Sequence, residues 1–213
     1  MTRFIRTMIA IISGAALLAA TAAASANDPG QIAPQGETAR AVLRNASGDA
    51  VGLVRVTQLG SNVRVKVKVT SQTPGFHGFH IHANDVPANG IGCIADAAMA
   101  SSTWFVSADG HYKSDPAQTH PAHAADMPVI LVNAGGNGVA TFKTDRFGVA
   151  DVIGKVVIMH ALPDNYANIP IGATATDYTP NTDDPASTAT ATGKTLATGN
   201  AGDRILCGKI AGA

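Results

Sequence analysis

The chain is short of charged residues, aromatic residues and cysteine. Only 14% of its residues are charged, and 15 basic side chains balance 15 acidic ones. A nucleic-acid-binding protein has an excess of basic residues, so this composition excludes that class of partner. Beyond the N-terminus, no uninterrupted apolar run approaches the roughly 20 residues that a membrane-spanning helix needs. We therefore expect no nucleic-acid partner and no membrane span.

Cysteine occurs twice, at Cys93 and Cys207. The wide separation, without a CxxC spacing, weakens the case for a metal site built on thiolates. In an oxidising compartment a lone pair of cysteines most often forms a disulfide, and two free thiols are the alternative. A bond that closed so long a loop would contribute about 4–5 kcal/mol to stability in the chain-entropy model.

The N-terminal residues have the pattern of a secretory signal. Arg3 and Arg6 form a basic head, residues 9–20 form a short apolar stretch, and Ala-Ser-Ala at residues 24–26 resembles a cleavage site. Cleavage would remove two basic residues and no acid, which leaves 13 basic against 15 acidic side chains and a net charge of −2. We expect export to the periplasm or the extracellular space. The expected organisation is a signal peptide at 1–26, a flexible segment at 27–37 and one domain at 38–213.

Short apolar runs of β type dominate the exported part. Residues 63–69 alternate strictly between valine and basic residues, which predicts a half-buried antiparallel strand. The glycines of residues 135–138 indicate a hairpin turn, and only residues 146–153 suggest a helical turn. Short strands with glycine turns are typical of a β-sandwich or barrel. Strands are expected at 38–43, 50–59, 63–69, 129–133, 139–143, 156–160 and 205–210.

Two long stretches, residues 83–125 and 161–203, interrupt this rhythm. Loops of this length inside a domain are usually functional or disordered. Within the second stretch, residues 174–198 are mostly Thr, Ala and Asp, which favours a flexible solvated loop. Several histidines fall in the first stretch, and Arg204 follows directly on the second.

Six of the seven histidines can be interpreted as one metal site. His80 and His82 lie two apart, and on a strand they would project from the same face. His120, His123 and Asp126 have a spacing that suits a tight loop around a tetrahedral cation. Imidazole favours copper and zinc, and the carboxylate fits zinc better. The remaining two candidates are His111 and His160.

Five motifs in order resemble those of the copper/zinc superoxide dismutases. The segments are GFHGFHIH at 75–82, SADGH at 107–111, HAADMP at 123–128, HALPD at 160–164 and TGNAGDRILCG at 198–208. The family patterns are GxHGFHxH, SAGGH, HxGDxP, HxxPD and TGNAGxRxxCG. The resemblance covers most of the chain from residue 38 onward. It implies an all-β fold, a Greek-key β-sandwich or flattened eight-stranded barrel with two long functional loops.

The resemblance also implies a role for each matching residue. Copper would be bound by His80, His82, His111 and His160. Zinc would be bound by His111, His120, His123 and Asp126. The supporting residues would be Asp164, which hydrogen-bonds a histidine of each site; His77, which ties backbone segments together without binding metal; and Cys93 with Cys207, which form a disulfide.

The implied activity is conversion of superoxide to dioxygen and hydrogen peroxide, with copper alternating between Cu(II) and Cu(I). Arg204 would dock superoxide, and His111 would deliver a proton to the product. Three departures stand out: Asp109 replaces a glycine and is expected to strain the turn before His111, the spacer from His120 to His123 is short, and Asp203 could weaken the potential of its neighbour. A copper-only dismutase and a non-enzymatic exported copper-binding module remain alternatives, and the sequence leaves a monomer and a homodimer equally open.

Overall fold

The computed structural model describes residues 36–167 and 188–213. The predicted signal peptide and residues 27–35 of the predicted flexible segment lie outside the described residues. All described residues belong to one compact unit, residues 32–213. Within the described part of the chain, no helix is long and apolar enough to cross a membrane.

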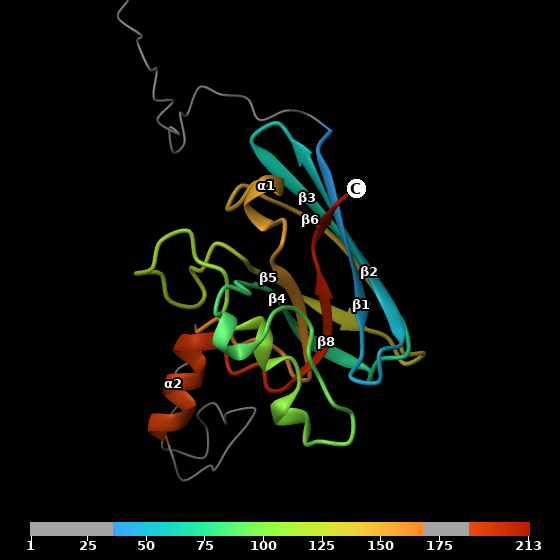
Figure 1. Cartoon of the computed structure of the whole chain (residues 1–213), viewed down its shortest axis with the longest axis vertical. Coiled ribbons are helices and arrows are strands. Elements are labelled where there is room, and N and C mark those ends of the chain that lie inside the picture. Colours follow the sequence, from blue (N-terminus) through green and yellow to red (C-terminus); the bar gives the residue numbers. More distant parts are fainter. Residues whose placement is uncertain (1–35, 168–187) are drawn as a thin grey trace, which may run out of the picture. The chain divides into compact units, whose positions relative to one another are not determined.

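Eight antiparallel strands close into a barrel (Figure 1). Their spatial order is β2-β3-β6-β5-β4-β7-β8-β1, and pairing of β1 with β2 closes the circle. Neighbours such as β3 and β6 are distant in sequence, which confirms the predicted Greek-key barrel. The strands are β1 (Thr38–Arg44), β2 (Ala50–Leu59), β3 (Asn62–Val69), β4 (Gly75–His82), β5 (Asp126–Val132), β6 (Gly138–Thr144), β7 (Val156–His160) and β8 (Arg204–Lys209), with a short β9 (Ala211–Gly212) beside β1.

Alternating side chains build the barrel wall. In β3 the four valines are buried while Lys66 and Lys68 are exposed, as the period of two predicts. The interior is filled by side chains that are at most 2% exposed, including Phe79, Ile81 and Ile130. Burial of such a side chain contributes roughly 1.5–3 kcal/mol, so this core holds the strand ends that carry the histidines.

Strand β7 is buried on both faces. Val157 and Met159 join the barrel core. On the outer face, Val156 and Ile158 belong to a second cluster that contains Phe105, Ala108 and Cys207, with Trp104 packed against it. This second cluster anchors the long segment after β4 on the outside of β7 and β8.

The long loops contain short helices. In the first loop lie the 3-10 turns η1 (Pro87–Asn89), η2 (Ser101–Thr103) and η3 (Val106–Ala108); α1 (Val149–Val152) precedes β7, and α2 (Thr188–Thr198) precedes β8. The prediction of a flexible loop over 174–198 is wrong for its last eleven residues, which form α2. Threonine is a weak helix former, so local sequence hides this helix. Contacts to the rest of the chain support it: the Asn165 side chain donates to Thr195 Oγ1 at 3.0 Å, and His120 N donates to the Leu196 carbonyl at 3.2 Å.

Candidate metal centre

The barrel brings together histidines from four separate places in the chain. His80 and His82 end β4, His160 ends β7, and His111 reaches β4 through an isolated backbone bridge with His82. His120 and His123 come from the loop that precedes β5. All six side chains are buried, with at most 4% of any of these residues exposed.

Four of these rings converge on one point. The donor atoms of His80, His82, His111 and His160 all lie within 4.8 Å of one another. His80 Nδ1 and the Nε2 atoms of the other three have no hydrogen-bond partner among the described residues. An unsatisfied buried polar atom costs about 1–3 kcal/mol. Four such atoms at one point match the donor set that copper prefers.

In three of these rings, a hydrogen bond to one nitrogen leaves the other nitrogen free. His82 Nδ1 donates to the Asp109 carbonyl at 2.7 Å, and His160 Nδ1 donates to the Gly202 carbonyl at 2.9 Å. His80 Nε2 lies 2.6 Å from Asp164 Oδ2. Such outer partners fix ring orientation and tautomer, so the lone pairs of these rings point at the common centre.

A second group surrounds the Asp126 carboxylate. Oδ1 lies 2.7 Å from His111 Nδ1, and Oδ2 lies 3.0 Å from His120 Nδ1 and 3.2 Å from His123 Nδ1. Asp164 links the two groups, because its Oδ1 lies 2.8 Å from His120 Nε2 while its Oδ2 contacts His80. His111 takes part in both groups, through Nδ1 in one and Nε2 in the other.

Burial and neighbouring charges shift the pKa values of these histidines in different directions. Burial lowers the pKa of His80, His82 and His111, and it lowers the pKa of His160 to about 3. These four imidazoles are therefore neutral near pH 7, as metal ligation requires. Burial also acts against protonation of His120, but its contacts with Asp126 and Asp164 outweigh burial and raise its pKa to about 9.

The Asp126 carboxylate shows the converse effect. Burial alone would raise its pKa, but hydrogen bonds from His111, His120 and His123 outweigh burial and hold the pKa well below the ordinary value. An ionised carboxylate among three imidazoles is a suitable donor set for a divalent cation.

Arg204 lies beside the first group in an open cavity. The guanidinium donates from Nη1 to the Phe105 carbonyl and from Nη2 to the Asp109 carbonyl, each at 2.6 Å. The cavity has a volume of about 510 Å³. Arg204 and His160 line it together with Lys194 of α2 and Asp203, so one of the four imidazoles lies in a cavity with two basic side chains and one acidic side chain.

A disulfide joins Cys93 to Cys207 in β8, with 5.6 Å between the two Cα atoms. The long loop after β4 is thereby bound to the strand that begins with Arg204. Both carbonyls that accept from Arg204 belong to this loop.

Residues 50–210 match the sequence profile of a family described as copper/zinc superoxide dismutase (SODC). The chain belongs to this family. The superoxide dismutase [Cu-Zn] of Mycolicibacterium paratuberculosis is 32% identical over 179 residues, which cover 79% of this chain and 71% of the relative. That of Mycobacterium tuberculosis is 32% identical over 183 residues, 84% of this chain and 67% of the relative, and that of Deinococcus radiodurans is 30% identical over 148 residues, 63% of this chain and 78% of the relative.

Two solved structures share the fold of this copper/zinc superoxide dismutase family member. The clock protein EA4 has a TM-score of 0.56 and 22% identity, over 84% of this chain and 96% of that one. A double mutant of a SOD-like protein from Bacillus subtilis has a TM-score of 0.54 and 22% identity, over 79% of this chain and 94% of that one.

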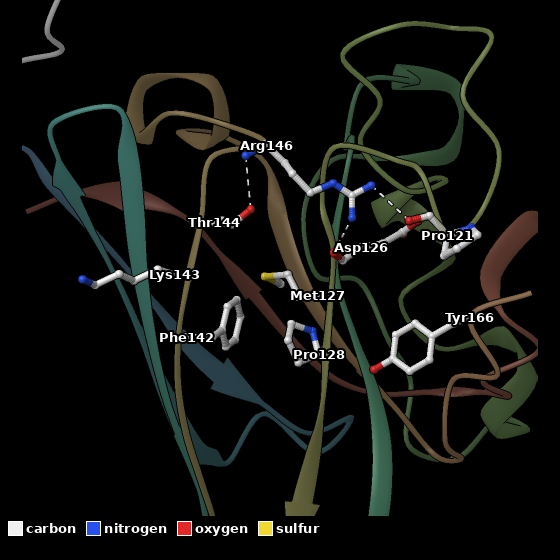
Figure 2. Close-up of a pocket in the computed structure, with 9 residues that line it drawn as sticks. All are labelled: Pro121, Asp126, Met127, Pro128, Phe142, Lys143, Thr144, Arg146 and Tyr166. Atoms are coloured by element: carbon white, nitrogen blue, oxygen red, sulfur yellow. Dashed lines mark hydrogen bonds between the residues drawn. The ribbon is translucent and has the colours of Figure 1, made fainter. Parts of the chain in front are cut away.

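The motifs of the dismutase family did not point to Arg146. Figure 2 shows its guanidinium directed at the backbone beside the second group, where it donates to the Pro121 carbonyl at 3.0 Å and the Asp126 carbonyl at 3.3 Å. These two bonds hold both ends of the short segment 121–126, which contains His123 and directly follows His120. A cavity of about 310 Å³ opens there, lined also by Tyr166. A single arginine outside any motif carries no signal in the sequence for this role.

Other expected residues lie as follows. His77 contacts two backbone carbonyls, with Nδ1 2.7 Å from His160 O and Nε2 2.8 Å from Thr73 O. Asp203 lines the cavity and accepts from Ser101 Oγ at 2.5 Å. Asp109 has a positive φ of 64°, in the region where glycine is favoured, as its replacement of a glycine led us to expect.

Proposed function

We propose that the protein is an exported superoxide dismutase that uses copper and zinc to convert superoxide to dioxygen and hydrogen peroxide. One observation carries the proposal: four neutral, unpartnered imidazole nitrogens converge within 4.8 Å of one another, beside an arginine in an open cavity. Family membership supports the same reaction.

The convergent group is the copper site in this proposal. Its ligands are His80 through Nδ1 and His82, His111 and His160 through Nε2. Bound copper supplies one-electron chemistry by alternating between Cu(II) and Cu(I), which zinc cannot do. The outer hydrogen bonds of these rings hold their free nitrogens in place before the metal arrives, which lowers the reorganisation that binding requires.

The group around Asp126 is the zinc site in this proposal, with His111, His120 and His123 as the other ligands. A compact set of donor atoms here includes His80 in place of His123. We assign His123, because His80 Nε2 is already engaged by Asp164, whereas His123 Nδ1 lies 3.3 Å from His111 Nδ1 and faces Asp126. The short spacer between His120 and His123 is thus compatible with both rings facing one ion.

Two side chains act on the substrate. Arg204 presents a charge that is fixed by two backbone carbonyls, and a preorganised cation in a partly dehydrated cavity stabilises a bound anion more than a mobile one does. His111 Nε2 is one of the four unpartnered nitrogens, and we assign to it the proton that the second superoxide acquires on becoming peroxide. The second proton comes from solvent through the open cavity.

Export is part of the proposal. The Cys93–Cys207 disulfide is a bond that persists in oxidising compartments, and the N-terminal residues have a secretory pattern. The periplasm and the extracellular space both provide such conditions.

The test compares Arg204→Ile with wild type and with Arg40→Ile, a matched change at an exposed arginine on β1. Arg204 is not one of the proposed metal ligands, so both variants should retain copper and zinc in elemental analysis. Superoxide turnover of Arg204→Ile should fall about tenfold or more, because local fields raise anion encounter rates by roughly 10–10³. Arg204→Lys should retain part of the activity, since ammonium lacks the planar fork.

The outcomes separate the alternatives. Wild-type turnover by Arg204→Ile at low ionic strength would refute the docking role. Full copper loading without turnover in the wild type would favour a copper-binding module. Activity in a protein that takes up copper but no zinc would establish a copper-only dismutase.

A further inference from the structure

Asp109 occupies a backbone conformation that ordinarily requires glycine. Its φ is 64° and its ψ is −154°, a region that is almost restricted to glycine and is unfavourable for other residues. The family motif has glycine at this position, so this chain accepts strain that its relatives' pattern avoids. A compensating interaction is therefore expected.

The compensation comes from the carboxylate. Oδ2 accepts from the backbone N–H of Asp85 at 2.7 Å and of Val86 at 2.8 Å, and Oδ1 accepts from the Asn89 side-chain amide at 2.8 Å. Asp109 is only 9% exposed. A hydrogen bond to a charged group is stronger than one between neutral groups, so three of them offset the backbone strain. They join the turn before His111 to the segment that directly follows β4.

The carbonyl of the same residue serves the metal centre. It accepts from His82 Nδ1 at 2.7 Å and from Arg204 Nη2 at 2.6 Å. The first bond places the proton of His82 on Nδ1 and leaves Nε2 free. The second bond directs one arm of the guanidinium. Three covalent bonds, through Cβ and Cα, join the carboxylate carbon to the carbonyl carbon, so fixing one group restricts the other.

We propose that Asp109 is a positioning residue: its carboxylate, fixed by the N–H groups of residues 85–89, locks the carbonyl that sets the tautomer of His82 and the direction of Arg204. The consequences for copper and superoxide rest on the function proposed above. The tautomer and the orientation of the guanidinium are properties of the polypeptide, so they can be measured without turnover.

Three substitutions separate hydrogen bonding, charge and strain. Asp109→Asn can keep all three bonds if the Asn89 amide flips, since the new amide oxygen accepts from residues 85 and 86 while the NH₂ donates to Asn89. Asp109→Ala keeps the strain and loses the bonds. Asp109→Gly loses both. Asp85→Ala is the matched control, because it removes an exposed neighbouring charge and leaves the backbone N–H in place.

The tautomer of His82 is read from imidazole ¹⁵N shifts of the metal-free full-length protein at neutral pH, and azide affinity is read optically on the copper-loaded protein. We expect wild type, Asp109→Asn and Asp85→Ala to keep the proton on Nδ1. In Asp109→Ala and Asp109→Gly, the ratio of the two tautomers should shift about tenfold toward Nε2–H, the scale of one ordinary hydrogen bond, and azide should bind several-fold more weakly.

Loss of thermal stability in the Ala and Gly variants with an unchanged tautomer and azide affinity would overturn the proposal. So would a wild-type tautomer in Asp109→Gly beside a changed one in Asp109→Ala, because strain would then be the cause. If Asp109→Ala does not fold, Asn89→Ala removes one of the three bonds and should give a smaller shift in the same direction. A shifted tautomer in a protein without dismutase activity would support this inference while refuting the proposed function.

Discussion

Acidification of the metal-free protein is the perturbation for which the buried imidazoles make the sharpest prediction. Burial lowers the pKa of His80, His82, His111 and His160 below the ordinary 6.5. As pH falls below 6.5, the unfolded chain takes up protons at these positions and the folded chain does not. Stability must therefore decrease with falling pH. His120 has the opposite effect, because its pKa is raised to about 9. Its contribution to the free energy of unfolding is complete below pH 6.5 and is lost as the pH rises from 6.5 through 9.

The magnitude follows from His160. A pKa of about 3 in the folded state, against 6.5 in the unfolded state, corresponds to about 5 kcal/mol lost between those two pH values at 1.36 kcal/mol per pH unit. That is comparable with the whole stability of a small domain. The other three buried imidazoles add losses of the same sign below pH 6.5, so the metal-free protein should unfold in mild acid with its optimum near pH 6.5. Asp126, whose pKa is held low, adds a loss only below the unfolded carboxyl pKa of about 3.9.

The assay is urea unfolding of the metal-free protein from pH 4 to pH 8, for wild type and His160→Asn. The asparagine amide can take the place of Nδ1 as donor to the Gly202 carbonyl but does not titrate. The slope of unfolding free energy against pH between 4 and 6 should be smaller in His160→Asn by about 1.4 kcal/mol per pH unit. Equal slopes would show that His160 is protonated in both states, which would refute the reasoning from burial. Metal-loaded protein should keep its stability to lower pH, since ligation competes with protons.

Two further predictions concern covalent and steric constraints. Replacing Cys93 and Cys207 together by alanine removes a bond that spans 114 residues and should lower the free energy of unfolding in urea by about 5 kcal/mol in the chain-entropy model; a loss under about 1 kcal/mol would contradict that model here. Gly199→Ala would drive a Cβ into the Asp164 carboxylate and should lower zinc content and stability. The control is Gly193→Ala in α2, where the new Cβ has nothing within 4 Å; this change should be neutral or stabilising by roughly 0.5–1 kcal/mol. Similar metal content and melting temperature in both alanine variants would refute the steric role of Gly199.

Local patterns in the sequence were sufficient for most of the barrel wall, but they gave no bounds for β4 (Gly75–His82). The predicted strands 50–59 and 156–160 have the bounds of β2 and β7, because alternation and β-branched side chains are properties of neighbouring residues. β5 was predicted at 129–133 but begins at Asp126. Its first residues pair with β4 across Pro128, and a proline hides such a start because it lacks a backbone donor.

The sequence by itself also determined the family, since five motifs in the family order contain most residues of the candidate centre. Only the tertiary structure decided which nitrogen of each ring is free, because that depends on partners such as Asp164 for His80, 84 residues away in the chain. The helix α2, the brace from Arg146 and the anchored carboxylate of Asp109 were likewise hidden. Each depends on contacts that form only when the barrel closes and the disulfide-bonded loop packs on its outer face, and no local propensity contains such contacts.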